Sequence, residues 1–277
     1  MIRRAACLLP CLLLLLPVDA DAQSARRQAP PPDPLFDHTL SVTGSLGYAS
    51  TDTTVRLDAS DGTPGTVLDA EDDLGLDEQD VAERLEITLR PRERHRIRLA
   101  LAALPGDRRA SVVPDEDLRV GDDVYAAGET LRSKLRFRAW SASYAYSVLR
   151  QPRFEVALSA GVASIGVLAE TAVPERGASE RFEETVPVPQ LGVEASFRVT
   201  PRWYAEARYQ YFDLSASDAR GRLTQLDLAV MFQVNDHLSA GLGYALFDAD
   251  ADFRDPGDSG LFRFRTDGVM LVIRAGL

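Results

Sequence analysis

The chain has 277 residues, a formal net charge of −11 and two cysteines. Its acidic balance argues against binding to nucleic acid, which needs basic patches, and against peripheral docking on anionic lipid. Both cysteines, Cys7 and Cys11, lie within the first 22 residues. The rest of the chain therefore lacks disulfides, thiolate zinc sites and a cysteine nucleophile.

The N-terminus has the three parts of a secretory signal peptide. Arg3 and Arg4 supply positive charge, Ala5–Val18 is an apolar run, and Ala20–Ala22 is an A-x-A cleavage site. The apolar run is shorter than the about 20 residues of a transmembrane helix. We predict a cleaved signal peptide at 1–22, a proline-rich disordered leader at 23–38, and one folded domain at 39–277.

From residue 40 onward, apolar residues repeatedly alternate with small or polar ones. A period of two predicts strands with two different faces. The alternating segments, in chain order, are Leu40–Tyr48, Leu85–Leu89, Ile97–Leu101, Phe154–Val162, Leu191–Val199, Trp203–Tyr211, Leu226–Val234, Leu238–Leu246 and Val269–Leu277.

The segment Leu131–Leu149 is ambiguous. Its first half places Leu135 and Phe137 on the apolar face, whereas its second half places Trp140 and Tyr144 there, and the two sets differ in parity. Two alternatives follow. A β-bulge near Ala139 could reverse the phase, or Arg136 and Arg138 lie above the lipid and face lipopolysaccharide phosphates.

The connections between these segments alternate in length. Short turns are expected at Pro91–His95, Arg150–Arg153, Thr200–Arg202 and Asn235–His237, and longer connections at Thr51–Asp80, Pro105–Gly128, Val173–Thr185, Ser215–Arg222 and Ala249–Leu261. Short periplasmic turns and long extracellular loops are typical of outer-membrane barrels. We therefore predict an all-β fold, a single closed antiparallel transmembrane barrel of ten strands, with eight or twelve as alternatives.

A soluble barrel of the lipocalin type, apolar inside and polar outside, would also alternate. Two features favour the membrane alternative. The second face is rich in Gly, Ala and Ser with isolated charges of both signs, which suits a narrow lumen. Aromatic side chains lie on the apolar face, mostly toward strand ends, where membrane girdles belong. They are Tyr48, Trp203, Tyr209, Tyr211 and Tyr244.

An acidic segment, Leu68–Asp77 with the sequence LDAEDDLGLD, follows the first strand and precedes the tandem strand pattern. In these features the chain resembles uncharacterised outer-membrane β-barrel proteins of Gram-negative proteobacteria. The resemblance implies a fold and a location, the cell outer membrane, but no activity. The chain departs from outer-membrane barrels at its last residue, Leu277, because such barrels usually end in an aromatic residue.

The second face of the strands carries charged residues of both signs. Buried charges must be paired to be tolerated, so these side chains predict a salt-bridge network filling the lumen, as expected for a barrel near the eight-strand limit. A narrow pore is the alternative. The predicted network residues are Glu155, Glu194, Arg198, Glu206, Arg208, Asp227 and Arg274.

Two acidic clusters are candidate Ca²⁺ or Mg²⁺ sites, because these ions prefer oxygen ligands. The first lies in the acidic segment (Asp69, Glu71, Asp72, Asp73, Asp77 and Glu78), and its spacing matches no EF-hand. The second, Asp248, Asp250 and Asp252, is followed by Phe253 where a calcium loop has glycine. Both favour solvated surfaces, and we predict no metal or other cofactor.

The three histidines, His38, His95 and His237, are expected at the periplasmic end of the barrel. No base and nucleophile are expected to converge at the outer end, where lipid A and external peptides are met. We therefore predict that the protein is not an enzyme. A lipid- or peptide-modifying enzyme of the outer membrane remains the third function considered.

The first function is a structural or surface-interaction barrel, and the second is a small channel for ions or small solutes. The expected partners are outer-membrane lipid and lipopolysaccharide, with the barrel-assembly machinery acting during insertion. The sequence identifies no extracellular ligand.

Overall fold

The computed structural model describes residues 38–103, 108–174, 176, 178–215, 219–255 and 258–277. The predicted signal peptide and all of the predicted leader except His38 lie outside the described residues. Within the described ranges, no helix is both long enough and apolar enough to cross a membrane.

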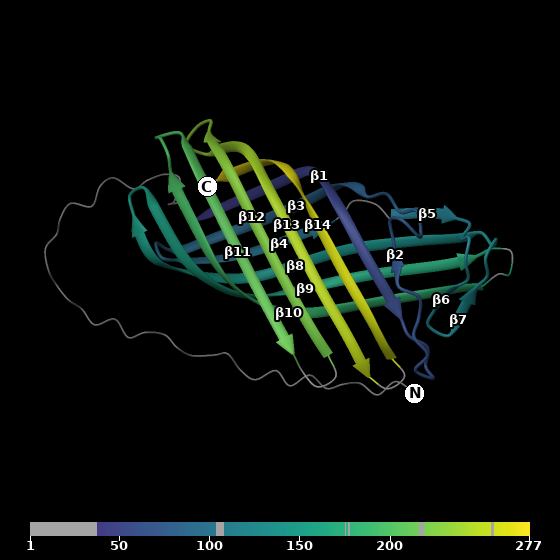
Figure 1. Cartoon of the computed structure of the whole chain (residues 1–277). Helices are drawn as coiled ribbons and strands as arrows, with labels where there is room; N and C mark the ends of the chain where they lie inside the picture. The colour runs from purple at the N-terminus through teal and green to yellow at the C-terminus, as the bar shows by residue number, and fades with distance from the viewer. Residues whose placement is uncertain (1–37, 104–107, 175, 177, 216–218, 256–257) are drawn as a thin grey trace, which may run out of the picture. The chain divides into compact units, whose positions relative to one another are not determined.

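Ten antiparallel strands form a closed barrel, as predicted (Figure 1). Each strand pairs with its neighbours in the barrel, and β1 closes the ring by pairing with β14 from Ser41–Gly276 to Leu57–Gly260. The ladder around the ring is thereby continuous at the apolar zone, although β10 pairs with β11 only from Leu191 to Arg198. The strands are β1 (Leu40–Leu57), β3 (Gln79–Arg92), β4 (His95–Ala103), β8 (Leu131–Gln151), β9 (Phe154–Val173), β10 (Ala178–Arg198), β11 (Trp203–Ser215), β12 (Ala219–Gln233), β13 (Leu238–Asp255) and β14 (Asp258–Gly276).

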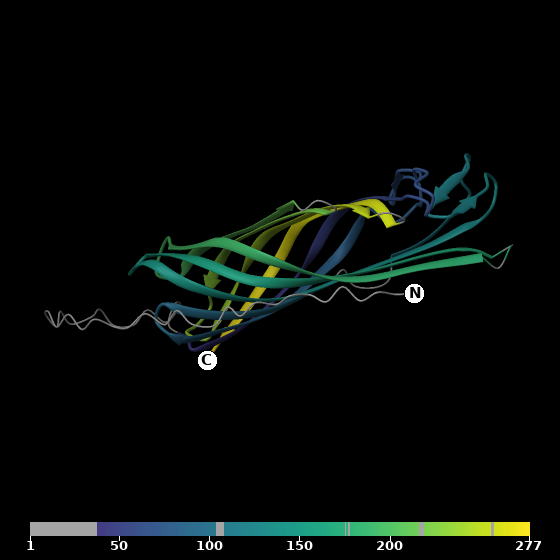
Figure 2. The ribbon, with the colours of Figure 1, turned by 90° about the horizontal axis from the view of Figure 1, so that it is seen from below.

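The four short turns occur at the predicted places, but three of the predicted long loops are mostly strand. Segments 173–185, 215–222 and 249–261 continue as paired ladders of β9–β10, β11–β12 and β13–β14. Beyond the apolar zone the outward face of these ladders is mostly polar, whereas the inward face carries apolar residues such as Val173, Leu223 and Phe264, all buried. The apolar positions therefore change parity along the strand, although the backbone pairing continues. β8, β9 and β10 form the longest such extension (Figure 2).

The outward face of the barrel is apolar over all ten strands. Leu191 and Leu242 are 68% and 63% exposed, which a soluble barrel with an apolar interior would not show. The apolar belt, as we call this zone, includes one such side chain from each strand: Leu46, Leu85, Leu99, Tyr144, Leu158, Leu191, Tyr209, Leu228, Leu242 and Leu271.

β8 keeps one phase from Leu131 to Ser147, so the first alternative, a bulge near Ala139, is wrong. Its register shift lies instead between Ser147 and Leu149, beside the short turn. Leu135 and Phe137 point inward and are 7% exposed, not on the apolar outer face as their half of the pattern suggested. Arg136 and Arg138 share the outward face with Trp140, as the second alternative requires.

The connections from β1 to β3 and from β4 to β8 build a cap at the long-loop end. The cap contains β2 (Leu68–Asp69), β5 (Arg108–Val112), which pairs with β8, and the hairpin of β6 (Leu118–Val120) and β7 (Asp123–Tyr125). Leu118, Val120 and Tyr125 pack on Leu131 and Val173 of the extended β8–β9 wall. The apolar residues of the cap thus cover the inner face of that wall.

Candidate functional site: a charged layer across the barrel interior

Six arginines and five carboxylates project into the lumen between the short turns and mid-barrel. We call this set the charged layer. Its members come from seven strands, so the barrel closure, not sequence proximity, brings them together. They are Arg84, Glu86 and Arg90 of β3, Arg96 and Arg98 of β4, Glu155 of β9, Glu194 of β10, Glu206 and Arg208 of β11, Asp227 of β12 and Arg274 of β14.

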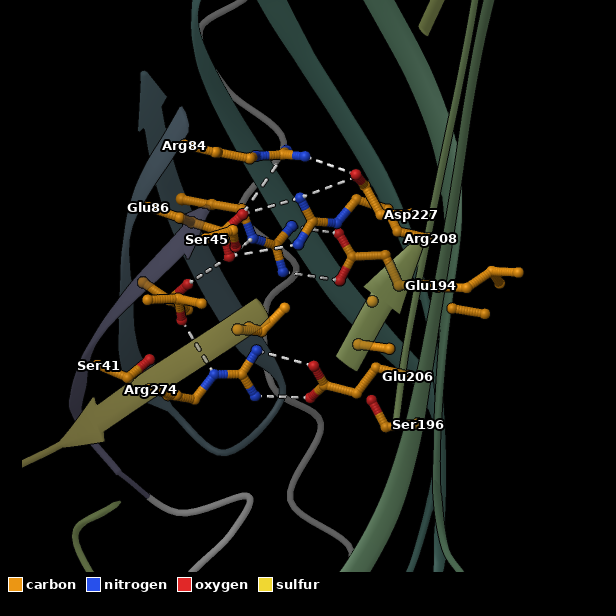
Figure 3. A pocket seen from close by; sticks show the side chains of 18 of the residues that line it. Ser41, Ser45, Arg84, Glu86, Glu194, Ser196, Glu206, Arg208, Asp227 and Arg274 are labelled. Atoms are coloured by element: carbon orange, nitrogen blue, oxygen red, sulfur yellow. Dashed lines mark hydrogen bonds and ion pairs between the residues drawn. The ribbon is translucent and has the colours of Figure 1, made fainter. Parts of the chain in front are cut away.

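One part of the layer bridges opposite walls (Figure 3). Arg84 of β3 contacts Asp227 of β12 at 2.5 Å. Arg208 of β11 donates to Glu86 of β3 at 2.9 Å and approaches Asp227 at 3.7 Å. Since β3 is not a neighbour of β11 or β12 in the wall, these ion pairs cross the lumen.

A second part continues the alternation of charges toward β9 and β10. Arg98 joins Glu86 at 2.9 Å to Glu194 at 2.5 Å. Arg96 then contacts Glu194 at 3.1 Å and Glu155 at 3.6 Å. Glu155, which is 1% exposed, also receives hydrogen bonds from Arg90 and from the Ser147 hydroxyl. Each inner carboxylate therefore faces at least two positive groups, the arrangement that makes buried charge tolerable.

Arg274 and Glu206 form a separate bidentate pair, with both nitrogen–oxygen distances at 2.7 Å. The Arg274 Nε atom donates to Thr43 Oγ1 of β1 at 3.0 Å. Planar forks of this kind fix orientation as well as charge. The pair connects β14, β1 and β11 across the short-turn half of the lumen.

Six of the seven residues predicted for the lumen network belong to the charged layer. The seventh, Arg198, lies next to the short turn after β10, where its guanidinium donates to the Pro201 carbonyl at 3.4 Å.

Sequence reasoning missed five arginine and glutamate members of the layer. They alternate with Leu85, Ile87, Leu89 and Ile97, whose apolar parity was recognised. The same parity assigns the intervening residues to the lumen, and this signal could have found them. The missed residues are Arg84, Glu86, Arg90, Arg96 and Arg98.

Two cavities lie inside the barrel, and ten of the eleven members of the charged layer line the lower one. The lower cavity, about 130 Å³, extends from His38 and Ser41 to mid-barrel. The upper cavity, about 100 Å³, lies on the side of Phe137 and Phe247. Both include Arg84 and Asp227 in their lining, so this ion pair separates them.

The acidic segment uses several of its carboxylates to hold its own backbone. Asp69 accepts hydrogen bonds from the Glu71 and Asp72 amides, and Asp73 accepts one from the Asp69 amide. Glu71 pairs with the buried Arg108 of β5 at 2.6 Å. Within the described ranges, no three His, Cys, Asp or Glu residues are grouped so as to hold a metal ion.

The ends of β1 and β14 are also joined by a carboxylate. Asp58, just after β1, accepts hydrogen bonds from the Ser259 hydroxyl at 2.8 Å and from the Gly65 amide at 3.0 Å. Burial opposes its ionisation, but these hydrogen bonds and the adjacent Arg56 hold the pKa of Asp58 below its usual value.

The second acidic cluster lies on a strand, not on a loop. Its residues Asp248, Asp250 and Asp252 are in β13. Asp248 is opposite Arg265 of β14, and Asp250 is opposite Arg263, which it contacts at 3.7 Å. This arrangement continues the outward face of β13 beyond the apolar belt as charged pairs.

The three histidines lie at the short-turn end. His38 and His237 have ring centroids 6.0 Å apart. The Nδ1 atom of His95 is 2.6 Å from the Tyr144 hydroxyl. None of these contacts joins a histidine to a carboxylate.

No family model matches the sequence, and no curated protein matches it. Among solved structures, the outer-membrane protease OmpT of Escherichia coli is similar over 87% of this chain and 97% of its own, with 12% identity and a TM-score of 0.60. A FadL homologue of Pseudomonas aeruginosa (11% identity, 87% and 90% covered, TM-score 0.39) and Ail of Yersinia pestis (12%, 84% and 98%, 0.35) are also similar. The likeness to OmpT shows the outer-membrane barrel fold and nothing beyond the fold.

Proposed function

We propose that the protein is an integral outer-membrane barrel whose lumen is closed by the charged layer, and that it acts through its envelope-embedded wall and its outer cap, not by conduction. The observation that carries this proposal is the run of ion pairs from Asp227 through Glu86 and Glu194 to Glu155, which crosses the lumen. Small barrels filled by side chains hold no open water path.

The location is supported by the apolar belt and by the aromatic side chains on the outward face. Trp203, 45% exposed, lies at the short-turn end of β11, and Tyr211 lies eight residues further along the same strand. Aromatic residues at both rims of an apolar zone are typical of membrane barrels. We propose export through the predicted signal peptide and insertion by the barrel-assembly machinery, with the short turns in the periplasm.

Lipopolysaccharide is the proposed lipid partner at the outer rim. Four basic residues share the outward face of β8 beyond Trp140: Arg132, Lys134, Arg136 and Arg138. They follow the apolar belt directly, at the depth where phosphate groups of the outer leaflet are expected. Charge-assisted hydrogen bonds to phosphate are the interaction that arginine favours.

The absence of cysteine from 23–277 allows a clean test of location and orientation. We expect Asp61→Cys, in the cap, to react with a membrane-impermeant maleimide on intact cells. Glu93→Cys, in the β3–β4 turn, should react only after the outer membrane is permeabilised. Labelling of Glu93→Cys alone on intact cells would reverse the orientation, and labelling of neither site after permeabilisation would contradict the location.

A narrow channel is the second candidate function. The two cavities favour it, because they follow one another along the lumen with the Arg84–Asp227 pair between them. Proteoliposome swelling in small sugars separates the two proposals. A closed lumen predicts swelling no faster than protein-free liposomes, whereas a channel predicts swelling that slows as the sugar grows.

We also propose that the protein is not an enzyme, since His38, His95 and His237 lie at the short-turn end, away from the cap. Peptide and phospholipid hydrolysis assays on the folded barrel test this. Turnover that survives replacement of all three histidines would indicate a carboxylate site, and turnover lost with them would place a histidine site at the periplasmic end.

A further inference from the structure

The upper cavity differs in chemistry from the rest of the lumen. Its walls are mainly small apolar side chains, with alanines from five strands. Phe137 and Phe247 meet edge to face at a centroid distance of 5.5 Å, and Phe137 stacks on Phe264 at 4.5 Å. The alanines lining the cavity include Ala49, Ala82, Ala100, Ala163 and Ala245.

One polar side chain in this lining has no partner. Gln190 of β10 is 2% exposed, and neither its Nε2 nor its Oε1 atom makes a hydrogen bond with another described residue. Leaving such a group unsatisfied costs about 1–3 kcal/mol. Its amide presents an NH₂ donor group and a carbonyl acceptor side by side, beside the apolar walls.

Apolar packing continues from the cavity to the cap. The cluster around Phe137 includes Val167, which also packs against the cluster of Leu76 and Leu135 beneath the cap. Leu74 in turn packs against that cluster and against the cluster of Leu118 and Tyr125 in the cap. The side toward the cap is therefore apolar, while the opposite side ends at the Arg84–Asp227 pair.

We propose that the upper cavity binds a compact aromatic molecule that carries a single hydroxyl group. Its ring lies between the alanine walls and the Phe137–Phe247 pair, and its hydroxyl exchanges a hydrogen bond with the Gln190 amide. At about 100 Å³ the upper cavity is smaller than, but of the same order as, the engineered apolar cavity of about 150 Å³ that holds benzene, so it limits the ligand to a single ring. This site goes beyond the proposed function and does not depend on whether the lumen conducts.

The proposal is tested by fluorine NMR titration of 4-fluorophenol and fluorobenzene with the folded barrel in detergent micelles. Ala245→Phe fills the cavity and defines the background partitioning of both probes into protein and micelle. Ala240→Phe is the matched control, because Ala240 shares the outward face of β13 with Leu242. We expect saturable 4-fluorophenol binding to the wild type and to Ala240→Phe, and none to Ala245→Phe.

Gln190→Met keeps the volume of the side chain and removes its hydrogen-bonding groups. We expect it to fold, as judged by the gel mobility shift, and to bind 4-fluorophenol about fivefold more weakly, which is the equivalent of one neutral hydrogen bond. Its affinity for fluorobenzene should not change. Binding of both probes with equal affinity by the wild type, unchanged 4-fluorophenol affinity in Gln190→Met, or equal signals from the wild type and Ala245→Phe would each overturn the proposal.

Discussion

At the residue scale, the charged layer depends on carboxylates that each serve several arginines. Glu86 is the clearest case, because it accepts from both Arg98 and Arg208 and lies 3.8 Å from Arg84. Its side chain is 7% exposed and lines the lower cavity. Removing this one charge leaves three arginines facing each other in the lumen.

We therefore expect Glu86→Gln to destabilise the barrel by about 3–5 kcal/mol, the usual cost of leaving buried charges unpaired. The heating midpoint of the folded band in unboiled gel samples should fall. Glu83→Gln, an exposed position on the same strand, is the control and should leave the midpoint unchanged. Equal midpoints for the two variants would mean that the ion pairs around Glu86 contribute little.

The coupling energy of a single ion pair is easier to measure for Arg274 and Glu206, because few other charged side chains contact this bidentate pair. We expect Arg274→Gln and Glu206→Gln each to lower the midpoint, and the double variant to lower it by less than the sum of the two. A double-mutant cycle measures this coupling. Additive losses would show that the two side chains act independently.

The sequence predicted this layer in part, and the reason is local. Glu194, Glu206, Arg208 and Asp227 lie in long alternating segments, where parity assigned them to the lumen. Their partners on β3 and β4 lie in shorter segments and were not counted. Pairing itself could not be predicted, because Arg84 and Asp227 are 143 residues apart and meet only when the barrel closes.

At the element scale, every strand must present apolar side chains to lipid over the depth of the belt. Leu242, in β13, lies within this zone, and Leu238, the first residue of the same strand on the same outward face, lies at its short-turn edge. We expect Leu242→Arg to cost about 2–4 kcal/mol and Leu238→Arg about 0–1 kcal/mol, as for cations at the midplane and the interface of a bilayer. Equilibrium refolding into lipid vesicles measures both, and equal costs would contradict the assigned depth.

The cap is held by the buried Arg108–Glu71 pair, and Arg108 also donates to the Asp77 carbonyl. We expect Arg108→Met to release the acidic segment, so that glutamyl endopeptidase cleaves at Glu71 or Glu78 faster than in the wild type while the barrel still shifts on gels. Arg132→Met, on the outward face of β8, is the control. Unchanged cleavage in Arg108→Met would show that other contacts hold the cap.

Strand limits were predictable only where the apolar face points outward. The β9–β10, β11–β12 and β13–β14 ladders continue into segments that the sequence suggested were loops, and there the apolar residues, such as Val173 and Phe264, point inward. The phase of β8 was left open for a related reason. Leu135 and Phe137 are apolar and inward because the cap and the Phe cluster lie there, not because lipid does.

At the scale of the whole molecule, strand number, closure and the outward apolar face were all predicted, because nine alternating segments, the Leu131–Leu149 segment and connections of alternating length allow few other arrangements. The division of the lumen into two halves was not predicted. A polar, ion-paired half and an alanine-walled half follow one another along the barrel, separated by the Arg84–Asp227 pair. The central claim is that this interior is closed to ions.

Single-channel recording in a planar bilayer tests that claim most directly. The wild type is compared with Arg84→Ala/Asp227→Ala, which removes the pair between the cavities without changing net charge, and with Lys134→Ala/Glu170→Ala, which removes an ion pair of the same charges on β8 and β9. We expect no current steps from the wild type or the second variant, and discrete steps from the first. Reproducible steps from the folded wild type would contradict the closed lumen and establish the channel.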